Sequence, residues 1–271
     1  MVEKLEYWLP ELDANYIAYS CDMVRISLSL SPKMYMMVKG LILQDTENRR
    51  VDVNYSSKYH AYKYLYVLQY KNGGVATIGL YRNDCDATHR EYGFIEFNPN
   101  KLMNDDQFRD DFEELKKWAF IIGITRYDLA IDIPAGREDI SMLKTDNRKY
   151  FMERHSPSNT TEYLGSRHKP GYVKLYNKQK ESELAHPLTR LEVTCSEDSV
   201  RIPRVIDKTG LTPVENTIVT LALLNGNMTA AAAMLSPYYK KMFNDAVREY
   251  EIKFDQKAIK RIGMNVRGLL I

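Results

Sequence analysis

Apolar and polar residues alternate along several segments of the chain, and this pattern predicts β-strands with one buried and one solvated face. The clearest segment is residues 124–133, where Tyr127 and Leu129 point one way and Asp128 and Asp132 the other. The predicted strands are residues 22–31, 59–70, 75–81, 92–98, 124–133, 161–165, 172–178 and 189–195. Short Gly-containing loops join two pairs of these strands, which favours antiparallel hairpins.

A different period, of three to four residues, predicts helices. Residues 105–120 place Phe108 and Phe112 on one face of an amphipathic helix, with acidic residues near its start and basic residues near its end. The pattern in residues 137–153 is ambiguous, and we expect this segment to be partly helical.

The chain becomes mainly helical after about residue 196. Thr212 and Glu215 form a capping box around Pro213, which is a helix-start signal. Further helices are expected at residues 218–224, 229–235 and 237–254. We therefore predict an α+β fold, in which a central antiparallel sheet with helices packed on one face occupies residues 1–200. A helical region, either packed on this core or binding a partner, would occupy residues 201–271.

Composition and charge limit the function classes. The chain has 271 residues, of which 44% are hydrophobic and 27% charged, as in soluble globular proteins. Its formal net charge is only +2, so any surface that binds nucleic acid must be local. The 20 tyrosines suit half-buried strands, and they also suit the stacking of nucleic-acid bases.

The cysteines and the N-terminal segment bear on the cellular compartment. Cys21, Cys85 and Cys195 lie far apart and form no CxxC pair, so neither a zinc site nor a disulfide framework is indicated. Residues 1–13 carry charges throughout and do not resemble a signal peptide, and no apolar run is long enough to cross a membrane. We expect a cytoplasmic protein with no membrane partner.

The polar strand faces carry the candidate chemistry. If the strands share a sheet, Asp128, Asp132, Glu192 and Glu96 could gather near Tyr176. Such a surface can be an ordinary half-solvated sheet face. However, Asp is disfavoured in strands, and crowded carboxylates usually need a cation between them.

Carboxylate oxygens suit Mg²⁺ or Mn²⁺, and such a metal can polarise a phosphodiester. A tyrosine hydroxyl could then attack phosphorus and become joined to the 5′ end of the cut strand. Lys174 or Lys178 could favour the phenolate or neutralise the phosphate.

The same segments resemble a known family. The ordered set RYDLAID, YLGSRHKPGYVKLYNKQKE and TRLEV, together with IEFNPNKL, is similar to plasmid rolling-circle replication initiators of the replication initiation factor (Rep_trans) type and their HUH-like relaxase relatives. The resemblance covers about residues 90–196. It implies a metal-dependent DNA nicking-closing endonuclease that replaces the two-histidine metal motif with carboxylates.

By motif position, the resemblance makes Tyr176 the nucleophile, with Lys178 and Lys174 beside it. Tyr163 and Tyr172 are rival nucleophiles. The implied metal ligands are Asp128 and Glu192, with Asp132 and Glu96 as further candidates. Contacts to DNA are expected from Arg126, Arg167, His168, Lys169 and Arg190, although His168 can also be an ordinary solvated loop residue.

The implied partners are DNA at a plasmid origin, as a hairpin or a single-stranded nick site, a host helicase and a second copy in a homodimer. The alternatives are a conjugative relaxase with the same chemistry and a non-catalytic DNA-binding regulatory protein. The basic residues between Lys240 and Arg267 form either a helix on the DNA backbone or a solvated face.

Overall fold

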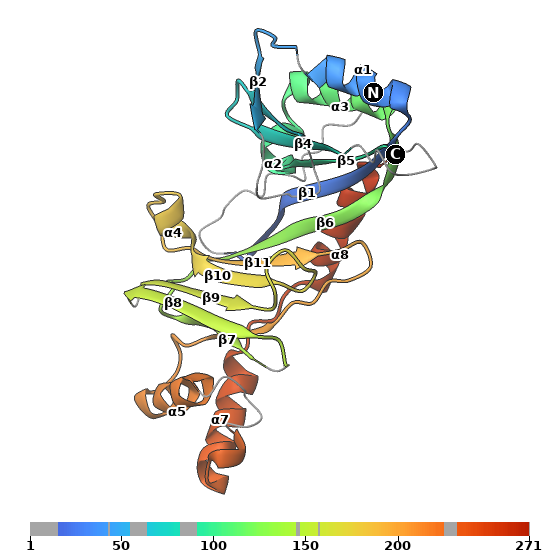
Figure 1. The fold of residues 1–271 in the computed structure, drawn as a ribbon. Helices are drawn as coiled ribbons and strands as arrows, with labels where there is room; N and C mark the ends of the chain where they lie inside the picture. Colours follow the sequence, from blue (N-terminus) through green and yellow to red (C-terminus); the bar gives the residue numbers. More distant parts are fainter. Residues whose placement is uncertain are drawn as a thin grey trace. The chain divides into compact units, whose positions relative to one another are not determined.

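The computed structural model describes residues 16–42, 44–54, 64–81, 91–144, 147–156, 158–224 and 232–270. The chain divides into two compact units. The first contains Ser20–Leu129 and Arg261–Ile271, and the second contains Glu11–Tyr19 and Ala130–Lys260. Figure 1 labels the long strand β6 (Phe120–Ile133). The division falls inside this strand, which therefore contributes to both units. The predicted strand start at residues 59–63, Cys85 and residues 229–231 of a predicted helix lie outside the described residues.

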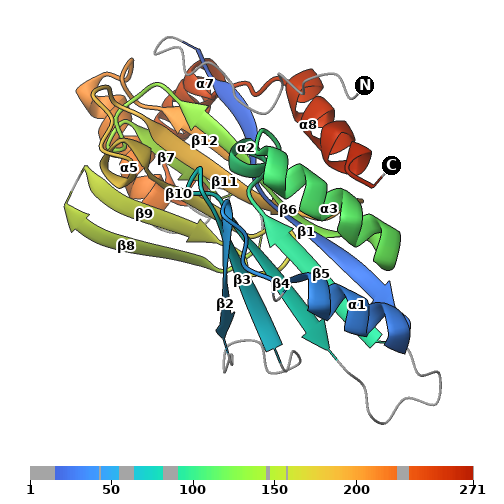
Figure 2. The same ribbon diagram turned by 90° about the horizontal axis from the view of Figure 1, so that it is seen from above.

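The first unit is an antiparallel sheet with helices. Its strands follow the order β2-β3-β4-β5-β1-β6, and Figure 2 shows helices α1 and α3 side by side. The strands are β1 (Ala18–Leu30), β2 (Arg49–Asn54), β3 (Tyr64–Tyr70), β4 (Val75–Tyr81), β5 (Glu91–Phe97) and β6. The helices are α1 (Pro32–Ile42), α2 (Pro99–Leu102), α3 (Asp106–Trp118) and the part of α8 (Gln256–Gly268) from Arg261 onward.

Helix α3 forms where its amphipathic pattern predicts it. Asp105 caps its start by accepting a hydrogen bond from the backbone N–H of Phe108. Phe108 and Phe112 are buried, and both rings contact Phe97 of the sheet. The helix ends at Trp118, two residues before the predicted end, because the chain already becomes extended at Ala119.

The strands of the second unit follow the order β6-β11-β10-β9-β8, and it also contains a two-stranded sheet, β12-β7. Its strands are β7 (Ile140–Leu143), β8 (Tyr150–Ser156), β9 (Asn159–Leu164), β10 (Val173–Asn177), β11 (Thr189–Cys195) and β12 (Arg204–Asp207). Its helices are α4 (Lys178–Glu181), α5 (Pro213–Leu224), α7 (Pro237–Tyr250) and the first turn of α8 (Gln256–Gly268).

A separate apolar core holds the helices of this unit together. Phe243 and Val247 of α7 pack with Val219 of α5 and with Leu143 and Ile206 of the small sheet. Thr212 and Glu215 exchange the hydrogen bonds of the predicted capping box at the start of α5. None of the described helices combines the length and the apolar character needed to cross a membrane.

The α+β class, the antiparallel sheet and the C-terminal helices are confirmed, with three corrections. The expectation of helix within residues 137–153 is wrong. Ile140–Leu143 form strand β7, and the segment from Tyr150 onward is the start of strand β8, which pairs with β9. The predicted helical region contains a strand, β12, which is held by its pairing with β7. The helix predicted over residues 237–254 ends at Tyr250, and α8 follows as a separate helix.

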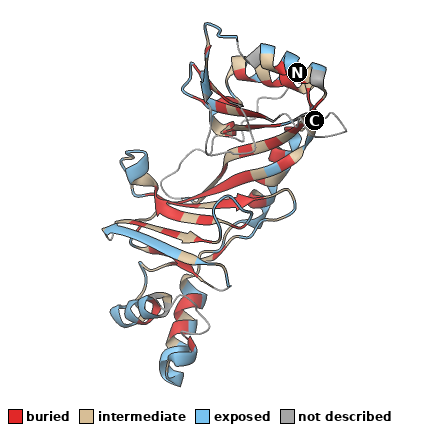
Figure 3. Cartoon of the chain, viewed as in Figure 1, coloured by how far each residue is buried: buried red, intermediate tan, exposed pale blue. Residues whose placement is uncertain are grey.

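Burial alternates along β1 and β9, as the sequence pattern predicts. The prediction of a solvated face is wrong for β6 from Tyr127 to Ile133 and for β11 outside Glu192, because these strands are buried on both faces. By contrast, β8 is exposed along much of its length (Figure 3). An edge strand has no neighbour on one side, so its side chains keep contact with solvent. The exposed large residues Phe151 and Met152 of β8 therefore lie at a sheet edge.

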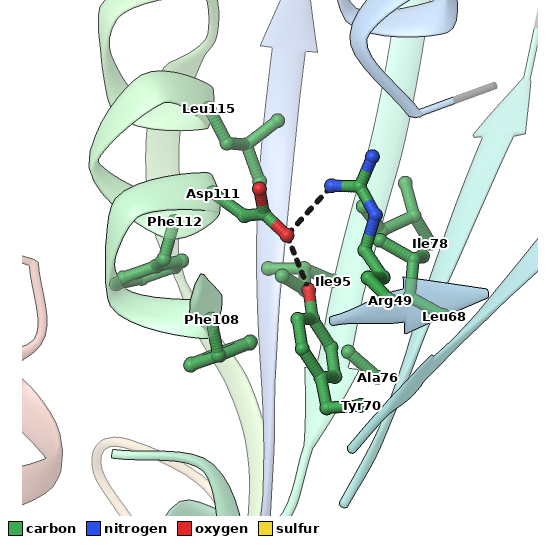
Figure 4. Close-up of a pocket in the computed structure, with 10 residues that line it drawn as sticks. All are labelled: Arg49, Leu68, Tyr70, Ala76, Ile78, Ile95, Phe108, Asp111, Phe112 and Leu115. Carbon is green, nitrogen blue, oxygen red and sulfur yellow. Dashed lines mark hydrogen bonds and ion pairs between the residues drawn. The ribbon is translucent and has the colours of Figure 1, made fainter. Parts of the chain in front are cut away.

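A buried polar cluster attaches α3 to the sheet of the first unit. Arg49 of β2 and Asp111 of α3 form an ion pair of 2.6 Å, and Tyr70 of β3 donates a hydrogen bond of 2.8 Å to Asp111 (Figure 4). Burial raises the pKa of Tyr70, and the Asp111 charge acts in the same direction. The adjoining cavity is about 10 Å³, which holds at most one water, so this cluster is structural.

An ion pair in the second unit connects the small sheet to the end of α7. Arg204 of β12 donates two hydrogen bonds to Glu251, and Lys253 donates a third. Hydrogen bonds from Arg204 lower the pKa of Glu251 to about 2, against the opposing effect of burial and with help from Lys253.

We predict that Asp111→Ala lowers the free energy of unfolding by about 3–5 kcal/mol, because it leaves the Arg49 charge buried without its carboxylate partner. Urea denaturation followed by circular dichroism measures this change. Asp110→Ala, at the adjacent exposed position, should change stability by less than about 0.5 kcal/mol. Equal effects of the two variants would contradict a structural role for the cluster.

The Glu251 ion pair predicts a pH-dependent contribution to stability. Because the pKa of Glu251 falls from 4.5 to about 2 on folding, its contribution is complete above pH 4.5 and is lost as the pH falls toward 2. The stability difference between the wild type and Glu251→Gln should therefore shrink over this range in thermal melts. Arg204→Gln should reproduce the effect, and a difference that grows on acidification would contradict it.

Candidate functional site

Strand register places a row of functional side chains on one face of the second unit. Phe151 pairs with Tyr163, Tyr163 with Lys174, and Lys174 with Glu192. Directly paired residues of antiparallel strands project from the same face of a sheet. The row therefore crosses β8, β9, β10 and β11, and we call this surface the tyrosine face. Tyr176 lies on it as well, two residues beyond Lys174.

Tyr176 is placed among charged groups. Its hydroxyl donates to Glu192 Oε2 over 3.5 Å, at the long end of the hydrogen-bond range. The Nζ of Lys174 lies 3.8 Å from the centre of the Tyr176 ring, a cation–π contact. The Tyr176 side chain is largely covered, with 5% of the residue exposed. Three of the residues predicted to act together thus lie in contact.

Glu181 of α4 is a fourth member of this group, and the sequence analysis missed it. Burial tends to raise the pKa of Glu181, but the hydrogen bond and the positive charge of Lys178, together with the charge of Lys174, bring it below its ordinary value. The Nζ of Lys178 lies 2.6 Å from Glu181. The short helix begins directly after β10, with Asn177 as its cap, and therefore places Glu181 five residues after Tyr176 on the next element. The capping residue after the strand was the signal that could have indicated it.

The rival tyrosines lie on the same face but in a different environment. Tyr163 donates a hydrogen bond of 3.0 Å to Glu153, and burial followed by this bond raises its pKa. Its ring stacks on Phe151 at 5.8 Å and on Tyr172 at 6.3 Å between centroids. Phe151 is 53% exposed, so the row Phe151–Tyr163–Tyr172 presents aromatic rings toward solvent at the sheet edge. Such a row can stack on unpaired bases.

The other predicted carboxylates are each paired with an arginine. In the first unit, Asp128 accepts two hydrogen bonds from Arg126, and Glu96 pairs with Arg25 of β1. β5, which carries Glu96, is separated from β6 by β1, so these two predicted neighbours are not adjacent strands.

In the second unit, Asp132 and Arg190 were predicted as separate contacts to metal and to DNA. Both nitrogens of Arg190 that face Asp132 donate to it over 2.7 Å, and both residues are buried. Each therefore neutralises the other's charge, and either predicted role would require this pair to open.

This arrangement does not fit a bound metal ion. Asp128, Asp132 and Glu96 already accept hydrogen bonds from arginines, whose positive charge opposes a cation at the same oxygens. Within the part of the chain that is described, no group of three or more His, Cys, Asp or Glu side chains is arranged to hold a metal. The role of Mg²⁺ or Mn²⁺ stays a prediction.

The remaining predicted DNA contacts lie in the loop between β9 and β10. Arg167, His168 and Lys169 are all exposed there. Gly165 and Gly171 enclose the loop with φ values of 90° and 85°, a conformation that glycine adopts without strain. The predicted hairpin is confirmed, and its tip presents two permanent positive charges to solvent.

Comparisons with known proteins give matches among solved structures only. No family model and no curated protein matches the sequence. Among solved structures, the chain is similar to a rolling circle replication initiator protein from Geobacillus stearothermophilus, with 13% sequence identity and a TM-score of 0.39. The match covers 94% of this chain and 97% of that protein.

The aromatic row predicts that Phe151→Ala weakens binding to single-stranded DNA by about tenfold, since one base–aromatic stack contributes roughly 1–3 kcal/mol. Fluorescence anisotropy with a labelled oligonucleotide measures the affinity. Phe120→Ala is the matched control, because Phe120 is 65% exposed on β6 and is not part of the row. If both variants bind like the wild type, the row is not a stacking surface.

Proposed function

We propose that this protein is a DNA nicking-closing endonuclease that initiates rolling-circle replication of a plasmid, with Tyr176 as its nucleophile. The observation that carries the proposal is the contact of the Tyr176 hydroxyl with Glu192, beneath the ammonium group of Lys174. The resemblance of the surrounding motifs to replication initiators supports the choice of DNA as substrate. A conjugative relaxase would use the same chemistry on a transfer origin.

The proposed reaction is an exchange of phosphodiester bonds. The Tyr176 oxygen attacks phosphorus, the bond from phosphorus to the 3′ oxygen breaks, and the 5′ end stays joined to the protein. The phenol proton passes to a carboxylate, for which Glu192 is placed, and the departing 3′ oxygen takes up a proton. In the reverse direction, a 3′ hydroxyl attacks the phosphotyrosine and rejoins the strand.

The charged neighbours have distinct roles in this proposal. The positive charge of Lys174 over the ring favours the phenolate over the neutral phenol. Lys178 forms an ion pair with Glu181, which fixes the position of its ammonium group on the helix that follows Tyr176. The exposed Arg167 and Lys169 in the hairpin loop would bind phosphates of the DNA strand.

Mg²⁺ or Mn²⁺ enters the proposal only as a requirement to be tested. Asp128 and Glu192 are the ligands expected from the motif, but Asp128 is paired with Arg126 as the structure stands. The proposed bond exchange uses only the side chains named for it and no metal ion. The homodimer and the host helicase likewise rest on the resemblance alone.

A non-catalytic DNA-binding protein is the second candidate. The arginine–carboxylate pairs and the low exposure of Tyr176 favour it, because both describe a surface stabilised without a substrate. It shares the aromatic row and the basic loop with the first candidate, and it differs in forming no covalent bond to DNA.

The decisive experiment mixes the protein with single-stranded oligonucleotides tiled across the replicon that encodes it, with Mg²⁺, Mn²⁺ or EDTA. Denaturing gels then detect a covalent protein–DNA adduct. We expect the wild type to form the adduct and Tyr176→Phe to lose it while keeping its affinity for DNA. Glu192→Gln should slow the reaction by about 10²–10⁴-fold, the usual contribution of a general base.

Tyr163→Phe is the matched control and should keep the activity. If Tyr163→Phe loses the adduct and Tyr176→Phe keeps it, the nucleophile is Tyr163. If the wild type binds the oligonucleotides and cuts none of them under any metal condition, the non-catalytic function is correct.

A further inference from the structure

The second unit contains a cavity of about 290 Å³ that the proposed nicking reaction does not use. Its walls include Tyr150, Met152 and Arg154 of β8 and Glu162 of β9. On β8 these residues alternate with Phe151, and Met152 pairs with Glu162. The cavity therefore lies on the opposite face of the sheet from the tyrosine face. Lys208, after β12, and Leu223 of α5 also line it.

One ion pair in the cavity wall, Arg137–Glu162, makes its hydrogen bonds to other residues of the protein. Arg137 donates to the backbone carbonyls of Thr160 and Ile140 and to Glu162. Glu162 also accepts hydrogen bonds from the Tyr150 hydroxyl and the backbone N–H of Met142. Both charges are buried and neutralised by each other, so this pair forms a rigid polar wall and leaves little charge for a ligand.

Two further cations face the same space without such partners. Within the described part of the chain, the side chains of Lys208 and Arg154 make no hydrogen bond and no ion pair. Burial lowers the pKa of Lys208. Glu162 and Asp139 act against this shift, whereas Arg137 and Arg154 favour it. The charged residues that line the cavity are Arg137, Arg154 and Lys208 on the positive side and Glu138 and Glu162 on the negative side, so the lining keeps an excess of one positive charge that an anion would neutralise.

The uncharged residues that line the cavity indicate which chemical groups are attached to the anion. Ser141 and Thr220 offer hydroxyl groups, Tyr150 offers an aromatic ring, and Met152 and Leu223 offer apolar surface. A cavity of this size accepts a small organic ligand rather than an inorganic ion alone. A phosphate group suits the two cations, and a sugar with a flat base suits the remaining surface.

We propose that this cavity binds a nucleoside monophosphate, with its phosphate between Lys208 and Arg154. The same chemistry is present in a free nucleotide and in the phosphorylated 5′ end of a DNA strand. The site is independent of the nicking proposal, because it lies on the other face of the sheet and includes neither Tyr176 nor Glu192.

Isothermal titration calorimetry of the full chain with dAMP, inorganic phosphate and deoxyadenosine tests the proposal. We expect dAMP to bind with a Kd below about 1 mM, and deoxyadenosine, which lacks the phosphate, to bind at least about tenfold more weakly. Lys208→Met and Arg154→Gln should each weaken dAMP binding by about tenfold, since each removes one charged hydrogen-bond donor.

Lys240→Met, at an exposed position of α7, is the matched control and should bind dAMP like the wild type. Tyr176→Phe should also keep dAMP binding, so failure of the nicking proposal leaves this result unchanged. Competition between labelled dAMP and 5′-phosphorylated or 5′-hydroxyl oligonucleotides distinguishes the two sources. Displacement by the phosphorylated strand alone identifies a strand end, and displacement by neither identifies a free nucleotide.

Two results overturn the proposal. One is the absence of dAMP binding to the folded wild type at millimolar concentration. The other is unchanged dAMP affinity in both Lys208→Met and Arg154→Gln. If Lys208→Met fails to fold in circular dichroism, Arg154→Gln decides the question, because Arg154 is exposed on an edge strand and its loss does not disturb a core.

Discussion

The register of the antiparallel strands β8 to β11 is the constraint on which the chemistry of the second unit depends. Pairing of Phe151 with Tyr163, Tyr163 with Lys174 and Lys174 with Glu192 puts the aromatic row and the charged tyrosine on one face. The same register sends Arg154 and Glu162 to the other face, where the cavity lies. A shift of one residue in any of these pairings would exchange the faces of that strand and separate the groups. Both proposed sites therefore follow from one set of backbone hydrogen bonds.

Buried charges in this protein are neutralised in pairs, and these pairs decide which polar residues are available for function. Asp111 binds Arg49, Asp132 binds Arg190, and Glu162 binds Arg137, each with a charge-assisted hydrogen bond. A charge left unpaired in such a position would destabilise the fold by several kcal/mol, so these carboxylates are committed to structure. The charged side chains that remain available to bind a ligand are those outside such pairs. The main examples are Lys174 over the Tyr176 ring and Lys208 in the cavity.

The two faces suit different tasks. The tyrosine face lies beside an exposed edge strand, which allows an extended ligand such as a DNA strand to approach. The cavity is lined by residues of β7, β8, β9 and α5 and suits a compact ligand. The Arg137–Glu162 pair, with Tyr150 bound to it, forms part of the cavity wall and is held by backbone carbonyls. These hydrogen bonds fix the cavity wall next to Lys208, and none of them involves Tyr176.

The sequence by itself determined the strands with a buried face, the amphipathic helix α3, the capping box of α5 and the shared face of Lys174 and Tyr176. It could do so because side-chain direction follows from local backbone geometry, with a period of two in strands and about 3.6 in helices. Arg126 and Asp128 stand two residues apart on one strand, so their pairing is local, but the tertiary structure decided which of the other charges meet. Asp132 and Arg190 are 58 residues apart, and Arg137 and Glu162 are 25 apart, so no local pattern relates them. The sequence therefore suggested a cluster of free carboxylates. The fold paired most of them with arginines, because a buried carboxylate needs a counter-charge and the nearest one depends on strand order.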